Sequence, residues 1–210
     1  CNFSNKLKCE LGVFPSFHKS RSNKFFHYES NSFFCLLDYI EGQYFEGTKA
    51  QLEEVAKVIN SINEYCSSIS QPNFFPSRRF DLVHINKIIK SIPQSRSSRK
   101  FLNPRQDSII SENIVDFYRA CDYLSETNNF HFGNEQLVHI DLHPHNILFK
   151  DNMLTGVLDI DSFKFAQPCI AYGFAAYKLY RQAIVHNNAI EEEYSISKFI
   201  DQMHINCNAE

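Results

Sequence analysis

The most informative part of the chain reads LVHIDLHPHN at residues 137–146, followed by VLDID at residues 157–161. Asp141 stands five residues before Asn146, and Asp159 follows thirteen residues after that asparagine. Carboxylate and amide side chains of this kind supply the oxygen ligands that Mg²⁺ prefers in proteins. The two stretches therefore predict one polar site built from three oxygen-bearing side chains.

The apolar residues around these side chains indicate how they could meet. The runs 146–149 and 155–160 are short and apolar, and the turn residues Asp151 and Asn152 lie between them. A hairpin at this point would bring Asn146 close to Asp159, with the loop after residue 140 alongside.

The loop itself is expected to be rigid. Pro144 prevents a regular helix, so Asp141 lies on a fixed turn from which it can face a substrate. Strand alternation places Asp161 on the same face as Asp159. Because no cysteine belongs to this set, it suits a hard cation such as Mg²⁺ better than zinc.

The composition limits the classes of protein that the chain can belong to. With 210 residues, it can form one large domain or two small lobes. A net charge of −3 gives no overall attraction to nucleic acid or to an anionic membrane, so neither is an expected partner. Seven irregularly spaced cysteines favour reduced thiols and a cytoplasmic location. No apolar run approaches the ~18 residues of a membrane-spanning helix.

The order of elements predicts an α+β protein. Two strand-like runs at 24–28 and 32–40 flank a turn at 29–31, and a helix is expected to begin at Thr48. A small sheet therefore precedes a mainly helical part that carries the polar motifs. The remaining expected helices cover residues 82–92, 111–125, 171–185 and 190–203.

Three stretches resemble parts of one known family. Residues 139–146 resemble the catalytic loop of the aminoglycoside phosphotransferase and choline kinase-like family, which has a protein-kinase-like fold. Residues 156–161 resemble the metal-binding strand end of that family, and residues 36–42 are similar to its hinge. The resemblance spans roughly residues 11–185, in which the two acidic motifs are its most specific part.

The resemblance implies a role for each matching residue. Asp141 would be the catalytic base, and His139 would brace the loop. Asn146 and Asp159 would hold the Mg²⁺ that bridges the ATP phosphates, and Asp161 would take a second metal or a metal-bound water. The backbone of the hinge would meet the adenine ring at residues Asp38, Tyr39 and Ile40.

The chain also departs from the family pattern. The phosphate-covering loop, the strand lysine and the helix glutamate of the family would all precede residue 1, so the chain looks truncated. Residues 1–41 are then a partial amino-terminal lobe with the last strands and the hinge, and residues 42–210 are the carboxy-terminal catalytic lobe. Gly173 stands where the family commonly has an aspartate that anchors the catalytic-loop histidine.

The resulting hypothesis is an ATP-dependent phosphotransferase that moves the γ-phosphoryl group to a hydroxyl of a small molecule such as an amino sugar, choline or homoserine. The acceptor would lie between the catalytic loop and the helices around 74–125 and 171–203. These 210 residues alone are expected to show little activity, because the clamp on the γ-phosphate would be missing. The oligomeric state is left open.

Two other functions stay open at this point. A metal-dependent hydrolase could use the histidine-rich run formed by His139, Asp141, His143 and His145, since histidine is a common zinc ligand. Alternatively, the chain could be a kinase-like binding module without turnover, which the missing phosphate loop would favour.

Overall fold

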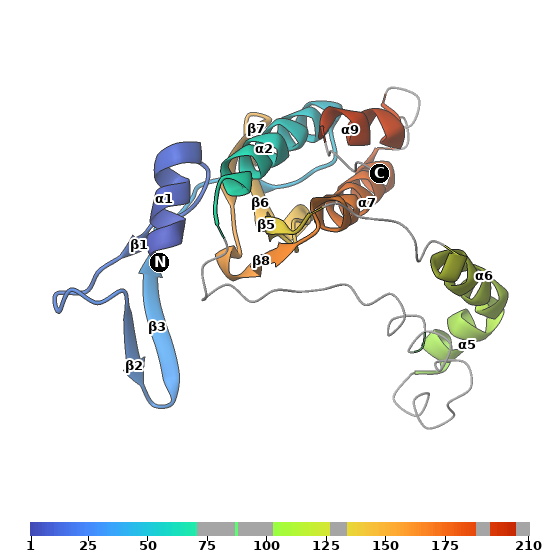
Figure 1. Cartoon of the computed structure of the whole chain (residues 1–210), viewed down its shortest axis with the longest axis horizontal. Coiled ribbons are helices and arrows are strands. Elements are labelled where there is room, and N and C mark those ends of the chain that lie inside the picture. Colours follow the sequence, from blue (N-terminus) through green and yellow to red (C-terminus); the bar gives the residue numbers. More distant parts are fainter. Residues whose placement is uncertain (71–86, 88–102, 127–133, 188–193, 205–210) are drawn as a thin grey trace. The chain divides into compact units, whose positions relative to one another are not determined.

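The computed structural model describes residues 1–70, 87, 103–126, 134–187 and 194–204 (Figure 1). Contacts between residues divide the chain into two compact units. The larger unit comprises Cys1–Arg78 with Phe132–Asn208, and the smaller one comprises Arg79–His131 with Ala209–Glu210. The expected boundary between lobes 1–41 and 42–210 falls inside the larger unit and stays a prediction.

The larger unit begins with a helix that was not predicted from the sequence. Helix α1 (Asn2–Leu11) buries Ser4 and Leu7, and Phe3 and Leu11 pack against the core at its edge. The spacing of Phe3, Leu7 and Leu11 is helical, but it covers only two turns. It ends at Gly12, whose positive φ of 74° lets the chain turn away from the last helical turn.

A small antiparallel sheet follows α1. Its strands β1 (Phe17–His18), β2 (Phe26–Glu29) and β3 (Ser32–Leu37) pair in the order β1-β3-β2. Ser30 and Asn31 both have positive φ, which is the geometry of a tight two-residue hairpin turn. The expected hairpin at 24–40 is therefore confirmed, with shorter strands than the apolar runs suggested.

Helix α2 (Lys49–Ser67) begins where the sequence predicted. The side-chain oxygen of Thr48 accepts a hydrogen bond from the Gln51 N–H and so caps the helix. The buried face of α2 contacts strands β5 and β7 as well as helices α7 and α9. The residues that form this buried face are Gln51, Leu52, Val55, Ala56, Ile59, Ile62 and Cys66.

Two further sheets carry the polar motifs. Strand β4 (Gln43–Tyr44) pairs with β6 (Ile147–Lys150), which pairs with β7 (Met153–Val157). Strand β5 (Gln136–His139) pairs with β8 (Phe163–Ala166). All of these pairings are antiparallel, and the expected turn at Asp151 and Asn152 is confirmed, with positive φ at both residues.

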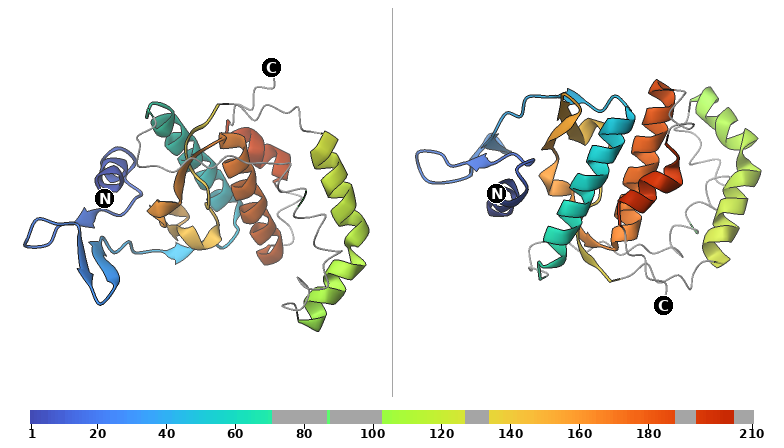
Figure 2. Two further views of the ribbon diagram at one scale, coloured as in Figure 1. Left: turned by 60° about the horizontal axis from the view of Figure 1, so that its bottom comes forward. Right: turned by 90° about the horizontal axis from the view of Figure 1, so that it is seen from above.

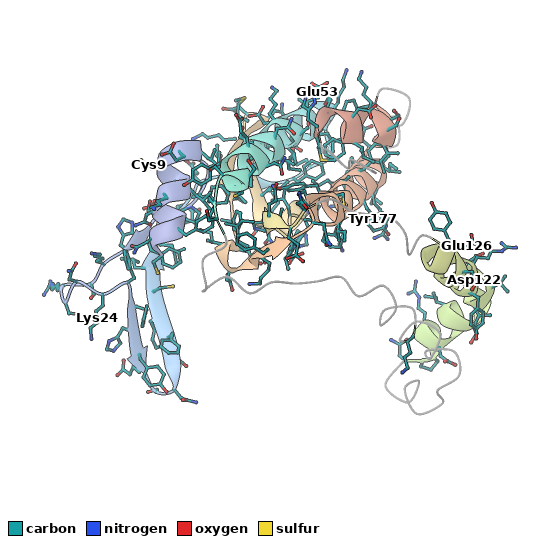
Figure 3. All side chains as sticks on the ribbon, viewed as in Figure 1. Cys9, Lys24, Glu53, Asp122, Glu126 and Tyr177 are labelled. Atoms are coloured by element: carbon teal, nitrogen blue, oxygen red, sulfur yellow. The ribbon has the colours of Figure 1, made fainter. Side chains whose placement is uncertain are left out.

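The remaining helices of the larger unit cover the strands. Helix α7 (Pro168–His186) and helix α9 (Ile196–Gln202) correspond to the expected helices 171–185 and 190–203. Figure 2 shows α2 and α7 running beside each other along the strands. Side chains from these elements fill the space between helices and strands in Figure 3 and form one hydrophobic core.

The smaller unit contains α5 (Pro104–Glu112) and α6 (Ile114–Glu126) among its described residues. The sequence predicted one helix over 111–125, whereas the structure begins a separate helix at Ile114. The expected helix at 82–92 lies almost entirely outside the described residues. In the described part of the chain, no helix is both long and apolar enough to cross a membrane.

Candidate active site

The hairpin β6–β7 brings the two acidic motifs together. Ile147 pairs with Val157, and the Leu158 N–H donates a hydrogen bond of 2.8 Å to the main-chain carbonyl of Asn146. The residue directly after Leu158 is Asp159. The expectation that a hairpin places Asn146 near Asp159 is therefore confirmed by the backbone pairing.

The loop before the hairpin is fixed by hydrogen bonds. Residues Pro144–Asn146 form a short 3₁₀ turn after His143. The side-chain nitrogen Nδ2 of Asn146 donates to the Asp141 carbonyl at 2.9 Å. Because Nδ2 is occupied in this way, the amide oxygen Oδ1 of Asn146 is the atom left to face a ligand.

The Asp141 side chain is accessible. It is 45% exposed, and its Oδ2 lies 3.8 Å from His143 Nε2. A bound molecule can therefore reach this carboxylate.

Asp159 has an unusual backbone conformation. Its φ of 57° and ψ of 55° lie in the left-handed region, which aspartate tolerates better than most non-glycine residues. The Ser162 hydroxyl donates to Asp159 Oδ2 at 2.5 Å. This bond is the main reason why the pKa of Asp159 lies below its usual value, with further lowering by Asp161 and by the nearby histidines. Asp159 is therefore a carboxylate at neutral pH, with one oxygen not held by Ser162.

Asp161 does not lie on a continuation of strand β7, contrary to the prediction from strand alternation. Strand β7 ends at Val157, and residues Ile160–Ser162 form a 3₁₀ turn after the left-handed Asp159. Alternation along a strand therefore does not apply there. Asp161 is exposed and close enough to Asp159 to lower its pKa, so the two carboxyl groups lie near each other for a different reason.

His139 connects the end of β5 to the Asp159 segment. Its buried ring lies 3.0 Å, through Nε2, from the Leu158 carbonyl, which can only accept. The proton is therefore on Nε2, and Nδ1 has no hydrogen-bond partner in the described part of the chain. Burial lowers the pKa of His139, so the ring is neutral. These contacts fit the bracing role expected of His139.

Gly173 does not affect this brace directly. It lies exposed on α7, and an added Cβ would meet no atom within 4 Å. The His139 ring has its partner in the Leu158 carbonyl instead. The loop histidine is therefore held without an aspartate at position 173.

The histidine-rich run does not form a metal site. His139 is buried and bonded to Leu158, whereas the rings of His143 and His145 lie 5.6 Å apart, centroid to centroid, in an edge contact. Within the described ranges, no three histidine, cysteine or acidic side chains are placed to hold one ion. The geometry therefore does not favour the zinc hydrolase.

The expected hinge lies directly after β3. The Asp38 carboxylate accepts from the Ser16 N–H at 2.9 Å and lies 2.6 Å from His18 Nε2. These two contacts lower the pKa of Asp38, the Ser16 bond most strongly. The side chain of Asp38 thus fixes the start of the hinge to β1.

The rest of the hinge lies against the β6–β7 hairpin. Thr155 Oγ1 donates to the Glu41 carbonyl at 3.2 Å. A Cβ on Gly156 would approach Ile40 Cγ2 to 2.9 Å, and one on Gly42 would approach the Phe149 carbonyl to 3.1 Å. Glycine at 42 and 156 therefore permits close packing of the hinge. Tyr39 points away, with 91% exposure.

A pocket beside Asp141 lies between the expected catalytic loop and α7, in part of the region where the sequence placed the acceptor. It has a volume of about 420 Å³, and its walls are the loop 141–145 and one face of α7. That face carries Lys178 and Arg181. Lys178 and Arg181 were not singled out from the sequence, although residues three apart on a helix share a face. That this face lies opposite loop 141–145 does not follow from spacing along the chain.

Comparison with known proteins gives a fold but no close relative. The sequence matches no family model and no curated protein sequence. Solved structures of phosphotransferases do match, at low sequence identity. Aminoglycoside phosphotransferase APH(3'')-Id from Streptomyces rimosus, in complex with ADP and streptomycin, aligns with a TM-score of 0.61 and 14% identity, over 97% of this chain and 73% of that one.

Two further phosphotransferase structures have a similar fold. An aminoglycoside phosphotransferase from Alicyclobacillus acidocaldarius aligns with a TM-score of 0.59 and 13% identity, over 97% of this chain and 68% of that one. The GDP and kanamycin complex of APH(2")-IIIa aligns with a TM-score of 0.55 and 14% identity, over 94% and 68%. The chain therefore has the α+β fold of the aminoglycoside phosphotransferases, which confirms the predicted fold class.

Proposed function

We propose that the chain binds a magnesium–nucleotide complex and belongs to an enzyme that transfers the γ-phosphoryl group of ATP to a hydroxyl of a small molecule. The observation that carries this proposal is the junction of Asp141, Asn146 and Asp159. Asn146 donates through its side chain to the Asp141 carbonyl and accepts through its backbone from the residue before Asp159. The likeness to phosphotransferase structures supports the same activity.

The donor set fits Mg²⁺. Asn146 offers an amide oxygen, and Asp159 offers a carboxylate whose lowered pKa keeps it charged. Oxygen ligands of this type suit a hard cation, and one or two protein ligands suffice because Mg²⁺ retains waters and phosphate oxygens. When bound, the ion would neutralise charge on the transferring phosphate. Asp161, close to Asp159, would hold a second ion or a metal-bound water.

Asp141 would act on the acceptor. Its exposed carboxylate can accept a hydrogen bond from the acceptor hydroxyl and take its proton as the bond to phosphorus forms. Phosphoryl transfer depends mainly on alignment, so the fixed loop around Pro144 matters as much as basicity. His139 would hold the Asp159 segment in place and take no proton, because its ring is buried and its Nε2–H is bonded to the Leu158 carbonyl.

The nucleotide base would lie against the hinge. Residues Tyr39 and Ile40 link β3 to β4 and make no backbone hydrogen bond within the described residues, so their peptide groups can pair with a base. Of the similar phosphotransferase structures, one contains ADP and another contains GDP, so either adenine or guanine is a candidate base. Both ATP and GTP therefore belong in the binding test.

The proposal is tested by calorimetric titration of the chain with ATP and with GTP, in the presence and absence of Mg²⁺. The decisive variant is Asp159→Asn, because asparagine also tolerates the left-handed backbone but lacks the charge. Asp151→Asn is the matched control, since Asp151 also has a positive φ and lies at the opposite end of the hairpin.

Magnesium-dependent binding that weakens at least about tenfold in Asp159→Asn and is unchanged in Asp151→Asn supports the proposal. Nucleotide binding that does not depend on Mg²⁺ contradicts the metal site. So does an equal loss of affinity in Asp159→Asn and Asp151→Asn. A variant of Asp141, Asp141→Asn, is expected to keep nucleotide affinity, because that side chain would contact the acceptor and not the nucleotide.

A further inference from the structure

The pocket beside Asp141 has a basic wall. One face of α7 contributes Phe174, Lys178, Arg181 and Val185, which follow one another at helical intervals of three and four residues. Opposite them lies the loop 141–145. The pocket that leads to the Asp141 carboxylate is therefore lined by two cationic side chains, Lys178 and Arg181.

Among the described residues, no acidic group forms an ion pair with these cations. Helix α7 contains no aspartate or glutamate, so neither Lys178 nor Arg181 has a partner one turn away on the same helix. In the described part of the chain, no ion pair involves either residue, and Lys178 Nζ instead lies 5.5 Å above the centre of the Phe174 ring. Of the described residues that line the pocket, Asp141 is the one with a carboxylate.

We infer that the acceptor is an anionic hydroxy compound, with a carboxylate or phosphate group that pairs with Lys178 and Arg181 while its hydroxyl faces Asp141. This inference rests on the proposed function and names the substrate class for it. A planar guanidinium can bind a carboxylate or phosphate through two parallel hydrogen bonds, and a lysine adds a second charge.

The same geometry disfavours a cationic acceptor. An ammonium group on the ligand would meet two like charges on α7, and the one available carboxylate is engaged with the reacting hydroxyl. Like-charge repulsion of this kind lowers the affinity for a cationic ligand relative to an anionic one. The inference therefore separates this pocket from one built for an amino sugar or for choline.

Four small probes that differ mainly in charge test the inference. Gluconate carries a carboxylate, glucose 6-phosphate a phosphate, glucitol no charge, and glucosamine an ammonium group. Binding of each probe to the chain is followed by ligand-observed NMR in low-salt buffer. Gluconate or glucose 6-phosphate is expected to bind more tightly than glucitol, with glucosamine weakest, and the better of the two anions identifies which group the pocket prefers.

Variants of the two basic residues test whether the probes bind in this pocket. Arg181→Gln combined with Lys178→Gln is expected to weaken anion binding about three- to tenfold, the range expected for partly exposed charge pairs. Lys57→Gln, an exposed lysine on α2, is the control and is expected to have no effect. Arg181→Glu is expected to reverse the preference toward glucosamine.

Three results overturn the inference: glucosamine or glucitol binding as tightly as both anions, an anion preference that survives the double variant, or no binding of any probe. Titration of the same samples with Mg²⁺ and ATP reports on the proposed function separately. Intact nucleotide binding with a failed probe test rejects only the anionic acceptor, whereas lost nucleotide binding rejects the phosphotransferase itself.

Discussion

The imidazole of His139 lies 3.0 Å from the carbonyl of Leu158, the residue directly before Asp159. This hydrogen bond joins the end of β5 to the turn that carries the acidic residue, across nineteen positions of sequence. A histidine that is buried, neutral and bonded to a carbonyl positions its neighbours and does not exchange protons. The candidate site thus depends on a residue that would never touch a substrate.

Replacement of His139 by phenylalanine tests this dependence. The ring is kept, but the Leu158 carbonyl loses its donor, so unfolding free energy is expected to fall by about 1–2 kcal/mol. Affinity for magnesium and nucleotide is expected to fall as well, because the Asp159 segment is no longer held. Urea unfolding and calorimetry measure the two effects. His27→Phe, at an exposed position on β2 away from the polar motifs, is the control, and equal effects of both variants would contradict the bracing role.

The same histidine makes stability depend on pH. Burial lowers the pKa of His139 in the folded state below its ordinary value of 6.5, so below that pH the unfolded chain takes up a proton that the folded chain does not. The stabilisation by neutral His139 is therefore fully present above pH 6.5 and is lost as the pH falls toward the folded-state pKa. Unfolding curves of the chain and of His139→Phe should converge as the pH is lowered. Parallel curves would show that the ring is not buried in its neutral form.

Ser162 is expected to control the charge of Asp159. Its hydroxyl is the largest cause of the lowered pKa, so Ser162→Ala should raise the pKa of Asp159 toward its usual range. NMR titration of the carboxyl carbon measures the change. With Ser162 present, the stabilisation by ionised Asp159 is fully present above pH 3.8 and is lost as the pH falls through the lowered folded-state pKa. In the variant the folded-state pKa lies closer to the unfolded value, so less stabilisation is present above pH 3.8 and less is lost below it. An unchanged pKa would show that the Ser162 contact does not persist in solution.

Two glycines are expected to respond in opposite ways to alanine. A Cβ on Gly42 would lie 2.9 Å from Leu148 Cβ and 3.1 Å from the Phe149 carbonyl, whereas one on Gly173 would meet nothing within 4 Å. Gly42→Ala should therefore destabilise the chain by about 1–3 kcal/mol. Gly173→Ala should stabilise α7 by about 0.5–1 kcal/mol, because alanine is the better helix former. Thermal unfolding compares them, and equal shifts would contradict the close packing of the hinge on the hairpin.

Much of the fold could be predicted because its signals are local. Thr48 marks the start of α2 by its capping chemistry, and Asp151 with Asn152 marks the turn between β6 and β7. The spacing of Asp141, Asn146 and Asp159 indicated a shared site, since the hairpin that joins two of them is itself short and local.

What the sequence did not reveal depends on long-range packing. Helix α1 carries only a two-turn apolar pattern, formed by Phe3, Leu7 and Leu11. Asp159 adopts a left-handed backbone that no neighbouring residue signals. The 3₁₀ turn that follows invalidated the strand-based placement of Asp161. The basic wall formed by Lys178 and Arg181 faces Asp141 only because α7 packs against the loop, which spacing along the chain does not determine.

The most direct test of the central claim locates the metal. Mn²⁺ takes oxygen ligands as Mg²⁺ does and is paramagnetic, so it broadens the NMR signals of nearby residues. With Mn²⁺ and ATP added to the chain, the signals of Asn146, Asp159 and Asp161 are expected to disappear first, and excess Mg²⁺ should restore them. Broadening centred on His143 and His145, independent of nucleotide, would contradict the phosphotransferase site and support a metal-dependent hydrolase instead.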